Sequence, residues 1–272
     1  GLGDVYKRQD IGDIVGVTGE VFTTQKGEIS VRASKIVLLS KSLRPLPEKY
    51  HGLTNTDLRY RQRYVDLIMN PDVKRTFELR SRIIRAIRNY LDSRGYMEVE
   101  TPILNTIPGG AAARPFITHH NTLDIDMYLR IAPELYLKRL IVGGFEKVYE
   151  MGRLFRNEGM DRTHNPEFTT IEVYKAFSDL EGMMDLTEGI ISNAANEVCG
   201  TYELEYKGNK ISLAPGFKRI SMTDAIKEKT GIDFADQLSF DDAKKLAEEH
   251  HIEVEPHFGY GHIINEFFEK YV

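Results

Sequence analysis

The stretch FRNEGMDRTHNPEFTTIEVY, residues 155–174, provides the strongest fold signal in the chain. Its pattern favours two strands, at about residues 145–157 and 168–177, with a polar loop between them. Strand side chains alternate between two faces, so Ile171 and Val173 are predicted to face a core. The stretch therefore predicts two neighbouring strands that can pair as a hairpin.

The other face of the second strand carries Phe168, Thr170, Glu172 and Tyr174. Successive members of this row lie about 6.7 Å apart in an extended strand. An aromatic ring, a carboxylate and a phenol at that spacing suit a binding surface better than a packed interior.

Arg156 and Glu158 share one face of the preceding strand. If the strands pair, these two side chains line one pocket with Phe168 and Glu172. The arginine offers a fork of donors to a phosphate, Phe168 offers a flat face to a base, and Glu158 can accept from an exocyclic amine. On alternation alone, a solvated hairpin with a surface Arg–Glu pair stays an equal alternative.

The loop between the strands adds Arg162, His164 and Asn165, all of which can donate to phosphate oxygens. The chain contains no Gly-x-x-x-x-Gly-Lys-Ser/Thr loop. Any nucleotide must therefore be held by side chains on strands and not by a glycine loop at a helix start.

The N-terminal part is predicted to be a short all-β piece. Residues 1–9 match neither neighbouring pattern and are interpreted as an artefactual start. Residues 13–24 and 28–40 favour strands around a turn at residues 25–27, and they are too few to close a barrel.

The next part is predicted to be a linker, residues 42–64, because Pro45, Pro47 and Gly52 interrupt every regular pattern. Asn70 and Pro71 then predict an N-capped helix start, and Gly95 predicts the helix end. This helix carries an apolar stripe of Phe77, Ile83, Ile84, Ile87 and Leu91.

Further helices are predicted from Pro133 to Gly143 and from a capping box of Ser178 and Glu181 to Gly200. The second of these is expected to bury Met183, Ile190, Ala194 and Val198. A turn at residues 207–209 predicts another hairpin. Long helices and antiparallel hairpins without regular βαβ alternation predict an α+β fold.

Composition restricts the possible environments of the chain. Its 272 residues are 41% hydrophobic, with a net charge of −5 that gives no global reason to expect a nucleic-acid partner. No apolar run approaches the roughly 18 residues needed to cross a bilayer, so no membrane partner is expected. The single cysteine, Cys199, excludes an internal disulfide and favours the cytosol. It lacks a basic neighbour and is given no catalytic role.

Several motifs then occur in a fixed order. Residues 155–159 (FRNEG) with 164–168 (HNPEF) resemble motif 2 of class II aminoacyl-tRNA synthetases, and residues 94–96 (RGY) with 99–102 (VETP) resemble motif 1. Within that class, the lysine-specific enzymes are resembled most, through residues 107–111 (IPGGA), 114–121 (RPFITHHN) and 130–140 (RIAPELYLKRL). The resemblance covers residues 13–272.

The resemblance implies an ATP site in which Arg156 is the catalytic residue that holds the α-phosphate and the attacking carboxylate. It places Glu158 at the adenine amine, Phe168 against the adenine, and His164 with Asn165 at the outer phosphates or the nucleotide. It also implies a lysine site of Gly110, Glu134, Glu172 and Tyr174. A substrate ammonium requires nearby carboxylates and a phenol oxygen, so this assignment has independent physical sense.

The resemblance implies activation of L-lysine by ATP and transfer of the lysyl group to tRNA(Lys), in a homodimer formed through the motif 1 region. It divides the chain into an OB-fold tail (residues 1–41), a linker (42–64) and an incomplete class II catalytic domain (65–272). Motif 3 and the acidic ligands of Mg²⁺ are expected downstream of Val272. We therefore predict no metal ligand in this chain and no adenylate formation by residues 1–272 alone.

Other functions stay open at this point. An aspartate or asparagine enzyme of the same class would need a cationic pocket, which Glu134 and Glu172 disfavour. A related enzyme that modifies a protein, or a non-catalytic module that binds RNA or a partner, is also compatible with parts of the pattern. The pairs at residues 119–120 and 250–251 are interpreted as hydrogen-bonded or surface histidines, and Met183 with Met184 as core.

Overall fold

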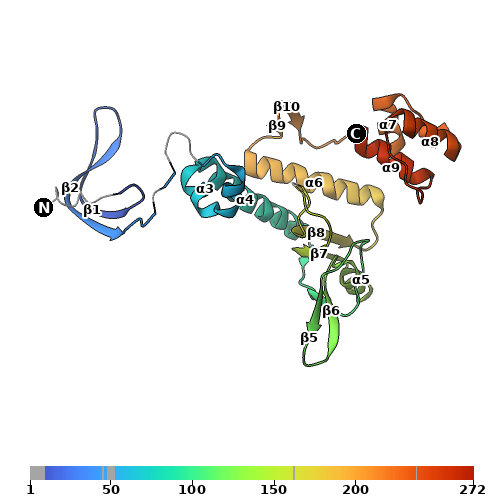
Figure 1. Ribbon diagram of the computed structural model, residues 1–272, viewed down its shortest axis with the longest axis horizontal. Helices are drawn as coiled ribbons and strands as arrows, with labels where there is room; N and C mark the ends of the chain where they lie inside the picture. Colours follow the sequence, from blue (N-terminus) through green and yellow to red (C-terminus); the bar gives the residue numbers. More distant parts are fainter. Residues whose placement is uncertain (1–9, 45, 48–52, 162, 237) are drawn as a thin grey trace. The chain divides into compact units, whose positions relative to one another are not determined.

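A computed structural model describes residues 10–44, 46–47, 53–161, 163–236 and 238–272. Two compact units make up the chain, Gly1–Tyr96 and Met97–Val272 (Figure 1). The expected artefactual start at residues 1–9 lies outside the described residues, as do Pro45, Gly52 and Arg162. None of the described helices has both the length and the apolar character needed to cross a bilayer.

The first unit begins with an antiparallel hairpin of β1 (Ile14–Thr23) and β2 (Ile29–Ser40). This confirms the two predicted strands. Gly27 sits in the turn at a φ of +82°, a backbone conformation that favours glycine. The larger apolar side chains of the hairpin are exposed in the described chain, among them Val17, Val21, Val31 and Val37.

The predicted linker, residues 42–64, is helical at its C-terminal end. It contains α2 (Thr56–Arg61), and α3 (Arg63–Met69) begins inside it. The Asn55 side chain caps α2 by accepting a hydrogen bond of 3.0 Å from the backbone N–H of Leu58. The prolines and the glycine upstream favour an irregular segment, whereas Asn55 starts a helix shortly after them.

The long helix α4 (Pro71–Ser93) starts at a proline, and Gly95 with a φ of +75° follows its end, as predicted. The predicted cap is wrong in one respect. Asn70 occupies the N-cap position, but its amide donates to Asp66 at 2.6 Å and makes no capping bond. Asp66 is a fully buried carboxylate that also pairs with two arginines, so its need for donors outweighs the cap.

The apolar stripe of α4 is buried only toward its C-terminal end. Ala86, Tyr90 and Leu91 are buried, whereas Phe77 and Ile83 are 45% and 40% exposed. The N-terminal half of the predicted stripe therefore faces solvent in the chain as described.

The second unit contains two three-stranded sheets. In the first, β7 (Lys147–Phe155) lies between β3 (Met97–Glu98), with which it is parallel, and β8 (Glu167–Lys175), with which it is antiparallel. In the second, β6 (Ile125–Leu129) lies between β4 (Leu104–Asn105) and β5 (Ile117–His120), and both pairings are antiparallel.

Two helices accompany these sheets. Helix α5 (Glu134–Val142) follows Pro133, as predicted. Helix α6 (Leu180–Cys199) ends at Gly200 as predicted, but Asp179 and not Ser178 is its N-cap, with its carboxylate accepting from Gly182 at 2.8 Å. A carboxylate suits the positive end of the helix dipole, which explains this choice.

The side chains that α6 buries match the prediction in part. Ala194 and Val198 are buried, Met183 and Ile190 are half-buried, and Met184 is exposed. The assignment of Met184 to the core is therefore wrong.

The chain continues through the hairpin of β9 (Glu203–Tyr206) and β10 (Asn209–Ser212), which turns at Lys207–Gly208 as predicted. A helical module follows, with α7 (Met222–Thr230), η1 (Phe234–Asp236), α8 (Phe240–Glu249) and α9 (Tyr260–Tyr271). Its own core contains Ile226, Phe234, Ala243, Ala247, Ile252, Ile263 and Phe267. Mostly antiparallel sheets with long helices confirm the α+β class.

Candidate active site

The predicted hairpin at the centre of the site is confirmed. Strands β7 and β8 pair so that Leu154 lies opposite Phe168 and Glu150 opposite Glu172. The backbone N–H of Arg156 donates to the carbonyl of Pro166 at 2.8 Å and extends the pairing beyond β7. Even-numbered residues of both strands therefore share one face, as alternation predicted.

The opposite face of β8 is less buried than predicted. Ile171 and Val173 are half-buried, while Tyr149, which pairs with Val173, is fully buried. The core on this face depends more on β7 than on β8.

Arg156 and Phe168 come together on the predicted site face. The guanidinium carbon of Arg156 lies 5.2 Å from the centre of the Phe168 ring. The Arg156 Nε is buried and has no hydrogen-bond partner in the described part of the chain. Because a buried donor without a partner is costly, this group is suited to an acceptor from a ligand.

Glu158 is held by a segment far away in the sequence. Its Oε1 accepts a hydrogen bond of 3.1 Å from the backbone N–H of Arg114. The Arg114 carbonyl in turn accepts a bond of 2.7 Å from the N–H of Asn157. These bonds fix the end of the segment that follows Gly110 against the end of β7.

The loop between β7 and β8 is organised by Asp161. Its carboxylate accepts from the side chain of His164 at 2.8 Å and from the backbone N–H groups of Thr163 and His164, each at 2.7 Å. These bonds, the His164 side chain first, hold the pKa of Asp161 far below its usual range. The His164 side chain is 75% exposed and Asn165 is also exposed, so both can reach a ligand from solvent.

Gly110 packs against the start of α5. Its φ is +90°, and a Cβ added to it would lie 3.0 Å from Cβ of Glu134 and 3.1 Å from Cβ of Ala132. Glu134 lies in the first turn of α5, where its carboxylate pairs with Lys138 one turn later. A side chain at position 110 would therefore press on the Cβ atoms of Glu134 and Ala132 and force the start of α5 to shift.

Glu172 and Tyr174 form a half-buried pair in which the phenol donates to the carboxylate at 3.1 Å. Burial raises the pKa of Glu172, and the negative charges of Glu134 and Glu150 add to the rise. The hydrogen bond from Tyr174 and the charge of Arg130 act in the opposite direction. Burial and the charges of Glu172 and Glu134 likewise raise the pKa of Tyr174.

The four residues predicted for a lysine site are linked in pairs, and the only hydrogen bond among these described residues joins Tyr174 to Glu172. Gly110 contacts Glu134, whose charge acts on both Glu172 and Tyr174. A cation placed among these carboxylates would relieve their mutual repulsion. A cavity of about 120 Å³ is lined by residues that include Asn105, Gly109, Leu135, Tyr136 and Arg139, and none of the four predicted residues is part of its lining.

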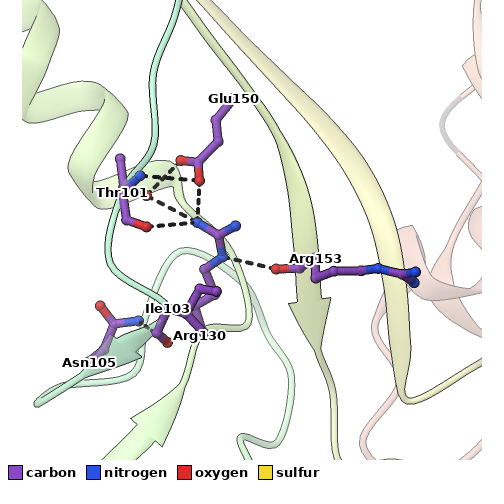
Figure 2. A network of polar contacts seen from close by, with 6 residues as sticks. All are labelled: Thr101, Ile103, Asn105, Arg130, Glu150 and Arg153. Atoms are coloured by element: carbon purple, nitrogen blue, oxygen red, sulfur yellow. Dashed lines mark hydrogen bonds and ion pairs between the residues drawn. The ribbon is translucent and has the colours of Figure 1, made fainter. Parts of the chain in front are cut away.

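Sequence reasoning missed three residues that form a polar network at this face. Arg130, which follows β6, forms a buried ion pair with Glu150, and Thr101 donates to both oxygens of that glutamate (Figure 2). A glutamate within the otherwise uncharged run at residues 148–152 (VYEMG) was a usable signal, because an isolated buried carboxylate requires a partner.

The described residues include no group of three or more His, Cys, Asp or Glu side chains arranged to hold a metal ion. The histidine pairs have other partners. His119 lies 3.2 Å from Asp126 and 3.3 Å from Asp124, and His250 hydrogen-bonds to the hydroxyl of Tyr271 at 2.9 Å.

Comparison with known proteins adds independent findings. The family model described as tRNA synthetases class II (D, K and N) matches residues 55–256. The chain is 61% identical to a protein named lysine–tRNA ligase from Lactococcus lactis subsp. lactis (strain IL1403), over 99% of this chain and 55% of that protein. Proteins of the same name match at 59% identity from Enterococcus faecalis (strain ATCC 700802 / V583) and at 57% from Bacillus subtilis (strain 168). These two matches cover 99% and 98% of this chain and 54% of each relative, so the chain spans about half the length of the relatives it matches.

Proposed function

The chain belongs to the class II tRNA synthetases of the D, K and N group, and we propose that the protein uses ATP to activate L-lysine to lysyl-adenylate. The lysyl group is then transferred to the 3′ end of tRNA(Lys). The name shared by relatives about 60% identical to this chain supports the proposal.

The choice of lysine within this group rests on one observation. The Tyr174 hydroxyl donates to Glu172, the negative charge of Glu134 acts on both groups, and Glu150 lies opposite Glu172 in the sheet. This concentration of carboxylates attracts an ammonium group and repels an acidic side chain. An aspartate substrate would need cationic groups in place of these carboxylates. The neutral side chain of an asparagine substrate would gain little binding energy from the carboxylates.

The reaction needs no nucleophile from the protein. The carboxylate of lysine attacks the α-phosphorus of ATP in line, pyrophosphate leaves, and the adenylate then gives its acyl group to the terminal ribose of the tRNA. Arg156 is proposed to hold the α-phosphate and the attacking carboxylate, because its buried Nε has no partner in the described chain and a guanidinium stabilises charge that develops during the transfer.

The remaining nucleotide contacts are proposed from the same face and loop. Phe168 stacks on adenine, and Glu158 accepts from its amine. His164 and Asn165 contact the outer phosphates. The guanidinium carbon of Arg156 lies 5.2 Å from the centre of the Phe168 ring. This short distance supports the placement, because the proposed phosphate donor and the proposed stacking ring are neighbours.

Three further features of the proposed enzyme concern its organisation. The exposed apolar side chains Phe77 and Ile83 of α4 support a homodimer through the motif 1 region. The exposed apolar side chains of the β1–β2 hairpin support its assignment to an OB-fold. Cys199 as the single cysteine of this chain supports a reducing compartment, for which we propose the cytosol.

The direct test is amino-acid-dependent exchange between ATP and pyrophosphate, measured on the full-length protein and on residues 1–272. We expect exchange by the full-length protein with lysine, and none with aspartate or asparagine. Exchange that depends on aspartate or asparagine would overturn the assignment to lysine. Exchange by residues 1–272 alone would show that the predicted incompleteness of the site is wrong.

A further inference from the structure

Arg130 and Glu150 form the most deeply buried ion pair among the described residues on the site face of the sheet. Their side chains are 4% and 5% exposed. The Nε of Arg130 donates to the carbonyl of Arg153 at 2.9 Å, and its Nη1 donates to Glu150 and to the hydroxyl of Thr101 at 3.2 Å (Figure 2). The guanidinium is therefore fixed in one position by partners on β7 and by the segment after β3.

Gly152 creates the space in which this guanidinium lies. A Cβ added at Gly152 would overlap Nη2 of Arg130, and Oε1 of Glu150 would lie 3.7 Å from the same Cβ. Gly152 pairs with Thr170, one position along the site face from Glu172. Arg130 thus lies against the face that carries the proposed amino-acid site, although β6, the strand that it follows, belongs to another sheet.

The two carboxylates next to this guanidinium differ in their partners. Glu150 accepts from Arg130 and from the backbone and hydroxyl of Thr101, so both of its oxygens are engaged. Glu172, directly opposite, accepts within the described residues from the Tyr174 hydroxyl alone. Two like charges opposite each other in a sheet are destabilising, and the arginine offsets this repulsion from one side.

We propose that Arg130 is a positioning residue of the amino-acid site: by pairing with Glu150, it leaves Glu172 and Glu134 as the carboxylates that select a substrate with a cationic side chain. This inference rests on the proposed function and adds a determinant of its specificity. The charged and titratable groups acting on Glu172 are Tyr174, Glu134, Glu150 and Arg130. Lys138 pairs with Glu134 on the side of α5.

The alternative is that the pair only holds β7 to its neighbours. Both roles predict lower stability when either partner is removed, because an unpaired buried charge is costly. The two roles differ in whether removing each partner changes the ionisation of Glu172, and in which direction. Without Arg130, the charge of Glu150 makes ionisation of Glu172 harder. Without Glu150, the charge of Arg130 makes that ionisation easier and also repels a substrate ammonium.

The experiment measures the lysine KM of the full-length protein against pH in the exchange assay. The variants are Arg130→Gln, Glu150→Gln, the double variant with both changes, and Arg130→Lys. We expect the pH below which the lysine KM rises to move up by about one unit in Arg130→Gln and down in Glu150→Gln. The double variant and Arg130→Lys should return close to the wild type. The KM for ATP should change little in all four.

Phe267→Leu provides a control for general instability, because it weakens the fully buried core of the α7–α9 module without altering charge. It should leave the pH midpoint unchanged. Midpoints that stay fixed in both single variants, or move in the same direction, overturn the inference. If Arg130→Gln does not fold, Glu150→Gln and Arg130→Lys still decide it, since the inference requires a downward shift in the first and none in the second.

Failure of the proposed function gives a different result. In that case the wild-type protein shows no lysine-dependent exchange, and no variant can be compared. Active wild-type protein with unshifted midpoints refutes the role of Arg130 and leaves the proposed function intact.

Discussion

Glu150 on β7 and Glu172 on β8 lie directly opposite each other, and of the two only Glu150 forms an ion pair within the described residues. Glu172 is instead hydrogen-bonded to a phenol and half-buried. This difference identifies Glu172 as a carboxylate available to a ligand, because its charge is the less compensated of the two.

Glu172→Gln should therefore weaken lysine binding. Loss of a charged hydrogen bond to the substrate ammonium costs roughly 1.5–3 kcal/mol, which corresponds to an increase of about 10- to 150-fold in the lysine KM. Steady-state exchange kinetics on the full-length protein measure this value. Glu181→Gln is a matched control, because this glutamate lies in the first turn of α6 and pairs with Arg219. An equal rise of KM in both variants would contradict a specific role of Glu172.

Stability should depend on pH through the same residue. Burial raises the pKa of Glu172 in the folded chain, so the folded state binds its proton more tightly than the unfolded state does. The contribution of Glu172 to the free energy of unfolding is therefore complete at a pH below the ordinary glutamate pKa. It is lost as the pH rises through the raised pKa of Glu172 in the folded chain. The wild type should thus lose stability relative to Glu172→Gln as pH rises through this window. Denaturant unfolding of both proteins across that range measures the difference, and a constant difference would contradict the raised pKa.

The hairpin at the site was predictable because its information is local. Alternation along residues 168–174 assigns side chains to faces, and the short polar loop brings the two strands together in register. Helix ends at Gly95 and Gly200 were also predictable, since a positive φ after the last turn favours glycine. The functional roles assigned to these residues remain predictions.

The contacts that could not be predicted join residues that are distant in the chain. Arg130 reaches Glu150 across 20 positions and Thr101 reaches it across 49, and no local pattern specifies either contact. Asn70 looked like a cap but donates to Asp66, because satisfying a buried carboxylate outweighs capping. Local propensity is thus overridden where a buried charge needs donors.

The helical module α7–α9 should lose stability when its core is truncated. Phe267 is fully buried and contacts Phe234 edge-to-face, with ring centres 5.0 Å apart. Phe267→Ala should cost about 3–5 kcal/mol, through lost burial and the cavity left behind. Hydrogen exchange should show a joint loss of protection in α7, α8 and α9. The control is Phe177→Ala, since Phe177 is 99% exposed, and similar losses in both variants would contradict the assigned core.

Gly110→Ala tests the contact between the glycine turn and helix α5. The substitution imposes two penalties, a side chain at a φ of +90° and a Cβ pressed against Glu134 and Ala132. Gly144→Ala isolates the first penalty, because Gly144 has a similar φ of +101° and no atom within 4 Å of an added Cβ. The backbone penalty alone is about 1–2 kcal/mol in each variant. We expect similar thermal destabilisation from that term in both proteins, and a raised lysine KM only in Gly110→Ala, because only there must the Glu134 carboxylate move. A normal lysine KM in a folded Gly110→Ala protein would show that Gly110 is not part of the amino-acid site. Glu134 and Glu172 would then be the proposed carboxylates of that site.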